Sequence, residues 1–101
     1  MHKVNDMNEK RKYRRVIFYT EADYGFNGKI TDISLGGAYI ETYTPLPEKS
    51  IINVKFQFPE GKDLVLKAVV KSSKQGMGMG IEFIELKEDD EAALLDFINA
   101  N

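Results

Sequence analysis

The chain has 101 residues, 43% of them apolar, which fits one domain with a single small core. It contains no cysteine, which excludes a disulfide framework and a thiolate metal site. The formal net charge of −2 argues against binding a polyanion by bulk charge. No apolar run is long enough to cross a bilayer and no secretion signal opens the chain, so we expect a cytoplasmic protein without membrane insertion.

The start of the chain differs from the rest in composition. Residues 1–14 are polar and lack apolar periodicity, which predicts a flexible arm ahead of a folded domain over residues 15–101. Cations gather where the arm meets this domain: Lys10, Arg11, Lys12, Arg14 and Arg15. Such a local cluster can mark a binding site, or it can be a solvated tail.

Alternation of apolar and polar residues dominates the chain after residue 15 and predicts about six short strands. They are expected near 16–20, 29–33, 38–42, 52–58, 64–71 and 76–84. Glycine, asparagine and proline between them supply turn chemistry, and the polar residues 72–75 predict a further turn. The segment 64–71 is apolar at one set of alternate positions and part apolar at the other, which allows cover on both of its faces.

The final segments complete the predicted architecture. The alternating glycines at 76, 78 and 80 either leave room for a close neighbour or form a barrel corner, and we favour the corner. Tyr39 and Met77 are interpreted as core residues. An apolar stripe within 94–98 predicts a helix, and the acidic residues 88–91 suit its N-terminus. A small antiparallel sheet would expose two edges unless it closed, so we expect an all-β barrel with one C-terminal helix.

Two short motifs carry the functional signal. Arg11 and Arg15 form an RxxxR pattern, and Asp32, Ser34 and Gly37 form a DxSxxG pattern on a predicted turn. An arginine fork can bind phosphate, read the O6 and N7 atoms of guanine, or stack on a base. An ionised aspartate accepts hydrogen bonds, as the N1–H and N2–H₂ groups of guanine require. Asp and Ser are also common turn formers, and this alternative stays open.

Together these motifs resemble the signature of the PilZ domain, a bacterial receptor module for the second messenger cyclic di-GMP. The resemblance covers residues 11–98 and includes Gly80-Ile81-Glu82-Phe83, which is similar to the family's closing strand. It implies a six-stranded antiparallel β-barrel and a stand-alone receptor that binds cyclic di-GMP through the five motif residues. Lys10 and Arg14 are possible secondary ligand contacts.

The two motif halves lie on segments of unlike order, the arm and the barrel, and this suggests a mode of action. We expect the nucleotide to draw the arm onto the barrel near residues 32–37, and the changed surface to signal to a downstream protein that the sequence does not identify. No cofactor besides this ligand, no metal and no DNA or RNA partner is expected. An enzyme is not expected either, because His2 is the one histidine and Ser34 has no evident base beside it.

Two alternatives remain at this point. The chain could be a PilZ-like adaptor that binds only proteins, although both motif halves are intact. It could instead be a small β-barrel that binds single-stranded nucleic acid through its basic arm and exposed aromatic residues. The second alternative predicts strongly salt-dependent binding.

Overall fold

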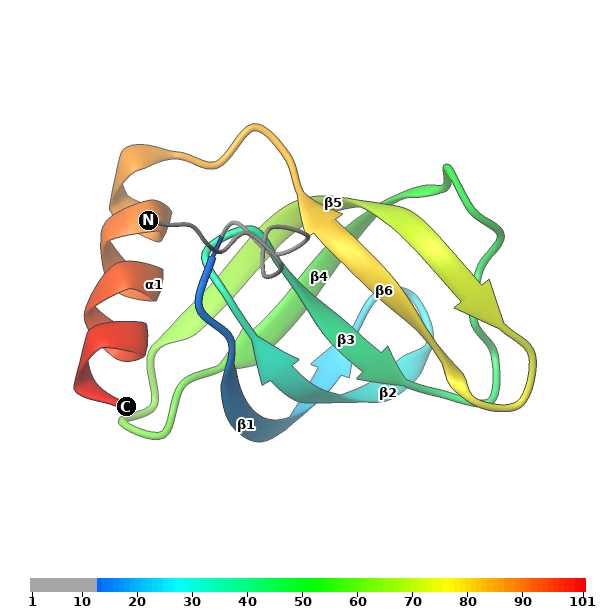
Figure 1. The fold of residues 1–101 in the computed structure, drawn as a ribbon, viewed down its shortest axis with the longest axis horizontal. Coiled ribbons are helices and arrows are strands. Elements are labelled where there is room, and N and C mark those ends of the chain that lie inside the picture. Colours follow the sequence, from blue (N-terminus) through cyan, green and yellow to red (C-terminus); the bar gives the residue numbers. More distant parts are fainter. Residues whose placement is uncertain (1–12) are drawn as a thin grey trace, which may run out of the picture.

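The protein folds as a closed barrel with a helix at one end (Figure 1). The structure is a computed structural model, and its described residues are 13–101. Its elements are β1 (Val16–Asp23), β2 (Asn27–Ile33), β3 (Gly37–Glu41), β4 (Ile51–Gln57), β5 (Asp63–Lys74), β6 (Gly78–Phe83) and α1 (Glu88–Ala100). The strands run antiparallel in the order β1-β2-β3-β6-β5-β4. The predicted fold class is confirmed. The predicted boundary between arm and domain at residue 15 stays a prediction.

Strict alternation builds the core. In β4 the side chains of Ile52, Val54 and Phe56 are buried, whereas Asn53 and Lys55 between them are exposed. Successive side chains of a strand point to opposite faces, so this pattern turns one face of every strand into the barrel. The inward residues of all six strands join one hydrophobic cluster.

The helix closes a gap that the strands leave. β1 pairs with β4 at only two positions, Ala22 with Phe56 and Asp23 with Lys55. Beside the unpaired part of β1, Phe97 of α1 stacks on Phe58 with ring centroids 4.6 Å apart. Figure 1 shows α1 lying across this end of the barrel. The acidic first turn of α1 is confirmed, and the helix dipole favours negative charge there.

Register shifts interrupt three strand pairs: β1–β2, β2–β3 and β5–β6. Such bulges bend a strand and increase its twist, which helps a short sheet to close. The shift in β5 lies between Val70 and Ser72, and the strand then continues to Lys74. The predicted turn at 72–75 is therefore wrong for 72–74, because these polar residues still pair with β6, and the turn lies at 75–77.

Several residues expected inside lie on the outer surface. Met77 is 54% exposed, and Tyr39 is half-buried on the outer face of β3. A Cβ at Gly78 would lie 2.8 Å from the Tyr39 hydroxyl, so the glycine leaves room for this ring, whereas the sequence had suggested a barrel corner. Val65 on the outer face of β5 is 56% exposed, so that face is not covered.

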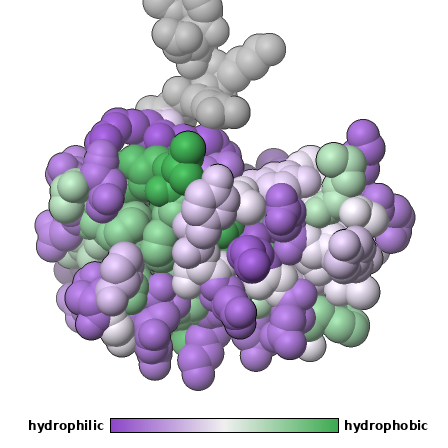
Figure 2. All heavy atoms as spheres, turned by 90° about the horizontal axis from the view of Figure 1, so that it is seen from below, coloured by the Kyte–Doolittle hydropathy of each residue, from purple (hydrophilic) through white to green (hydrophobic). Residues whose placement is uncertain are grey.

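The surface away from the core is mainly polar. Seen from below, hydrophilic side chains surround an apolar patch (Figure 2). On β1 the outward side chains of Ile17 and Tyr19 are 73% and 68% exposed. In residues 13–101 the helix α1 is the one helix, and it falls short of what a membrane span needs in length and hydropathy.

Candidate functional site

The turn between β2 and β3 is built around a buried serine. Ser34 is 4% exposed, and its Oγ accepts hydrogen bonds from the amides of Gly36 at 3.1 Å and Gly37 at 3.2 Å. The Ser34 amide donates to the Gly37 carbonyl at 2.8 Å. Ser34 therefore acts as a turn former, one of the two roles that the sequence allowed. Its contact with a ligand stays a prediction.

Gly37 is required by packing within the barrel. A Cβ at this position would lie 2.0 Å from the carbonyl oxygen of Ile81 in β6. That approach is far inside van der Waals contact and involves backbone, which cannot move aside easily. The absent side chain thus lets β3 pair closely with β6 directly after the turn.

The two motif halves meet through an ion pair. The Arg15 Nη1 atom donates to the Asp32 Oδ1 atom, and each side chain is 31% exposed. Asp32 lies on β2 and pairs with Ile17, so Arg15 sits at the strand end beside it. The motif arginine and the motif carboxylate are therefore neighbours before any ligand is present.

An aromatic ring covers the same turn. Tyr13 is 46% exposed, and its ring lies so close to Gly36 that a Cβ there would be 2.7 Å from the Cδ2 atom. A glycine at this position lets the ring rest on the backbone. One face of the turn is thus a platform made by Tyr13, with Arg15 two residues further along the chain.

These groups line a pocket of about 430 Å³ on the outer surface. Its walls come from the arm end, the β2–β3 turn, β5 and β6. They are Tyr13, Arg15, Ser34, Gly36, Gly37, Lys71, Ser72, Gly80, Ile81 and Glu82. Arg15, Ser34 and Gly37 of the predicted site are gathered here, and Asp32 joins through its ion pair.

The remaining predicted site residues lie elsewhere or outside the described part. The Arg14 guanidinium donates to the carbonyl oxygen of Ile98 at 2.9 Å and to that of Asn101. It thereby places a positive charge at the C-terminal end of α1, which the helix dipole favours. A secondary ligand contact of Arg14 would have to displace these bonds. Lys10 and Arg11 lie outside the described residues.

Sequence reasoning missed Lys71 and Ser72 as pocket residues. A regular strand would turn Ser72 inward, because Val70 two residues earlier is buried. The bulge breaks this alternation, so two successive side chains face outward. No local signal in the sequence marks the bulge.

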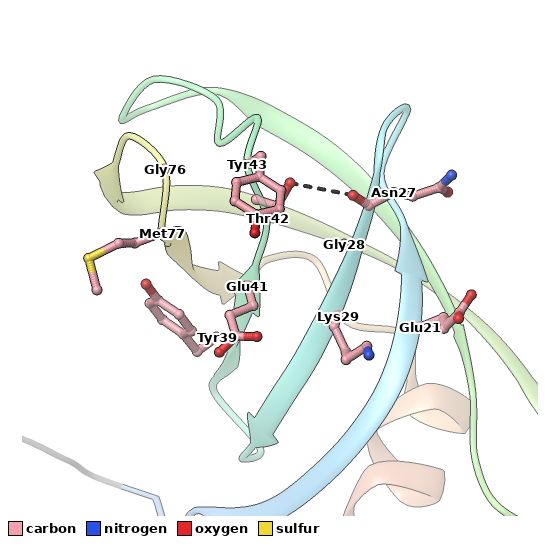
Figure 3. A pocket seen from close by; sticks show the side chains of 10 residues that line it. All are labelled: Glu21, Asn27, Gly28, Lys29, Tyr39, Glu41, Thr42, Tyr43, Gly76 and Met77. Atoms are coloured by element: carbon pink, nitrogen blue, oxygen red, sulfur yellow. Dashed lines mark hydrogen bonds between the residues drawn. The ribbon is translucent and has the colours of Figure 1, made fainter.

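A larger depression of about 720 Å³ lies over the other ends of β2 and β3 (Figure 3). Glu21, Lys29 and Glu41 stand at paired positions on three neighbouring strands, so one lysine lies between two acidic residues in the sheet. Tyr39, Tyr43 and Met77 also line it. It contains no motif residue, so its greater volume does not make it the better candidate.

The described part of the chain lacks two features that catalytic centres often use. Within residues 13–101, no group of three or more His, Asp or Glu side chains could hold a metal ion. Ser34, the one nucleophile of the motif, is buried and committed to the turn amides.

The family model of the PilZ domain matches residues 6–100. The chain belongs to the PilZ family. Its match includes the arm end, the complete barrel and α1, so the PilZ domain accounts for nearly all of the sequence given.

Solved PilZ structures share this fold at low sequence identity. The PilZ domain of YcgR from Escherichia coli, solved with c-di-GMP, is 16% identical, with a TM-score of 0.72 over 90% of each chain. The inhibitor of motility MotI from Bacillus subtilis is 19% identical, with a TM-score of 0.77. That match covers 87% of this chain and 48% of MotI.

A relative known from its sequence is much longer than this chain. A UPF0182 protein from Caldicellulosiruptor saccharolyticus is 27% identical over 73 residues. The match covers 69% of this chain and 8% of the relative. The chain therefore spans a small part of this relative and about half of MotI.

Proposed function

We propose that this PilZ protein is a receptor for cyclic di-GMP and passes the signal to another protein through its changed surface. The observation that carries the proposal is the Arg15–Asp32 pair at a pocket whose other walls include Ser34 and Gly37. Membership of the PilZ family and the c-di-GMP in the YcgR structure support the same ligand.

The ligand's groups suit this pocket. Cyclic di-GMP has two phosphate charges and two guanines, and an arginine fork binds either kind of group. The Asp32 carboxylate accepts hydrogen bonds from a guanine edge. The Tyr13 platform offers a π-face for a base, as aromatic rings do in many nucleotide sites.

Binding requires an exchange of partners. Arg15 and Asp32 are about one-third exposed, and water screens their mutual attraction. A nucleotide that offers phosphate to Arg15 and guanine N–H groups to Asp32 replaces one charge-assisted contact with several. The ion pair thus holds both side chains near their ligand-binding positions before the nucleotide arrives.

The energetics favour an arm whose inner end is already attached. Fixing a residue costs about 1–2 kcal/mol, whereas micromolar binding yields only about 8 kcal/mol. Tyr13 lies on Gly36 and Arg14 bonds α1 without any ligand, so these residues do not add to that cost. We expect the ligand to order only a short stretch around Arg11. Unchanged hydrogen exchange in residues 8–16 on binding would contradict this.

The proposed receptor acts on another protein inside the cell. It acts by binding alone, and its downstream partner is a protein that recognises the ligand-bound surface. A receptor for a nucleotide messenger is expected to act in the cytoplasm, where such nucleotides are made.

Isothermal titration with cyclic di-GMP tests the proposal, with GMP as the control ligand. We expect selective binding that the double substitution Arg11→Ala, Arg15→Ala abolishes. Glu41→Gln in the larger depression serves as the matched control and should leave binding intact. Absence of heat, together with an unchanged melting temperature at high ligand concentration, would refute the receptor and favour an adaptor that binds only proteins. Binding to single-stranded DNA with equal strength would favour the nucleic-acid alternative.

A further inference from the structure

The wall of the site on β5 is shaped by a bulge. Val70 pairs with Ile81, whereas Ser72 pairs with Gly80, so one residue, Lys71, is extra on β5. Val70 is buried, but Lys71 and Ser72 are both exposed. Bulges of this kind re-aim side chains and are common beside functional sites.

Lys71 keeps the outward direction that the alternation of β5 gives it, whereas the bulge turns Ser72 outward beside it. The two side chains have different surroundings. The Ser72 Oγ accepts a hydrogen bond from the Gly80 amide at 3.2 Å, so it is tied to the neighbouring strand. A Cβ at Gly80 would lie 2.8 Å from this Oγ atom, so Ser72 packs directly on the Gly80 backbone in the wall of the pocket. Lys71 is the one lysine among the described residues that line the pocket. Unlike that of Ser72, its side chain is not hydrogen-bonded to the neighbouring strand's backbone, so it can reach into the pocket.

Lys71 lies across the pocket from Arg15. Arg15 contacts β2, and β3 and β6 separate that strand from β5 in the sheet order. Three strand spacings correspond to about 14 Å between the backbones, a span that two long side chains can shorten. The pocket thus has one cation on each side and the glycine backbone of β3 and β6 between them.

The present partner of Lys71 is easily exchanged. Its Nζ atom is 3.5 Å from Glu82 Oε1, and the side chains are 63% and 54% exposed. Exposed pairs of this kind contribute little to stability because water screens them. A phosphate offers a better partner, since it can accept a short charge-assisted hydrogen bond.

We propose that Lys71 binds a phosphate of the nucleotide that Arg15 and Asp32 recognise, and that Glu82 holds Lys71 in place until the ligand arrives. This inference rests on the proposed function and adds a contact outside the two motifs. It assigns the second cation of the site to β5. Loss of Lys71 has two consequences, since it removes a phosphate contact and leaves the Glu82 carboxylate unpaired beside the ligand's negative charge.

The chain offers a matched control on the same strand. Lys67 also lies on the outer face of β5 and also pairs with a carboxylate, Glu85, at 3.2 Å. It does not line the pocket. The substitution Lys67→Gln removes the same charge from the same strand, so it reports any general effect of net charge or of stability.

Titration of the full chain with cyclic di-GMP tests the inference, with thermal unfolding to verify that each variant is folded. We expect Lys71→Gln to bind about 10-fold more weakly, the lower end for losing a hydrogen bond to a charged group. Lys67→Gln should match the wild type. Raising the salt concentration should weaken the wild type more than Lys71→Gln, because one charge contact is already missing.

Lys71 could strengthen binding by contacting the phosphate directly or only by neutralising the nearby Glu82 carboxylate. The double substitution Lys71→Gln, Glu82→Gln distinguishes these two effects. If Lys71 binds phosphate, the double variant stays weaker than Glu82→Gln alone. Equal affinity of these two variants would overturn the inference, as would equal affinity of Lys71→Gln and Lys67→Gln. In both cases binding by the wild type leaves the receptor function standing. A wild type that does not bind cyclic di-GMP refutes the receptor function, and this inference with it.

Discussion

The outer surface of the β2–β3–β6 sheet has two depressions that differ in size and in chemistry. The larger, about 720 Å³, is lined by two carboxylates and one lysine. The smaller, about 430 Å³, is lined by two cations and one carboxylate, and a hydrogen-bonded turn forms one of its walls. Charge of the right sign on a fixed backbone, more than volume, is our reason for proposing the smaller one as the site for an anionic ligand.

The two depressions also use glycine differently. Gly37 in the smaller one has a normal φ but no room for a Cβ, because the Ile81 carbonyl would lie 2.0 Å away. Gly76 in the larger one has open space around it but a φ of +76°. The first glycine is required by the packing of two strands, and the second only by the local conformation of a turn.

Alanine at these two glycines should therefore have unequal effects, and this is the largest difference that we predict. Gly37→Ala forces two strands apart and should lower the free energy of unfolding by about 3 kcal/mol, the upper end for overpacking. Gly76→Ala adds only left-handed strain, which costs about 1 kcal/mol. Urea unfolding of both variants measures the difference, and equal midpoints would contradict the assigned role of Gly37.

Removing one carboxyl charge from each depression tests the contrast in binding. Asp32→Asn should weaken cyclic di-GMP binding by about 10- to 150-fold, because it removes a charged acceptor and frees Arg15. Glu41→Gln should have no effect on the titration. If Glu41→Gln weakened binding as much as Asp32→Asn, the ligand would have to occupy the larger depression.

The smallest predicted effect concerns the two tyrosines. Tyr13→Ala removes the platform over Gly36, and we expect a loss of about 1 kcal/mol in the binding free energy, the lower end for stacking of a base. Tyr43 is 87% exposed and lines the larger depression, so Tyr43→Ala should leave the affinity unchanged. Fluorescence titration of both variants measures this. Tyr13→Phe should restore wild-type affinity if the ring alone is needed.

Much of the architecture could be predicted because it depends on short-range patterns. The alternation in β4 predicts which side chains enter the core, and the acidic first turn predicts where α1 begins. The two motifs led to the family, and the turn chemistry of Ser34 was one of the roles considered. These features depend on residues a few positions apart, so the sequence shows them directly.

The features that escaped prediction depend on contacts between distant segments. Tyr39 faces outward between the buried Ala38 and Ile40, and its ring packs into space left by Gly78 of another strand. Arg14 bonds the carbonyl of Ile98, 84 positions away. Neither partner can be identified from the neighbouring residues.

By itself, the sequence determined the strands, the helix, the glycine-supported turn and the family, because side-chain periodicity and turn chemistry act locally. Only the tertiary structure decided that Arg15 meets Asp32 and that Lys71 and Ser72 line the same pocket, Ser72 because a bulge turns it outward. Register is the physical reason. One extra residue in a strand reverses the face of every side chain beyond it, and closure of the whole barrel decides where that residue is accommodated.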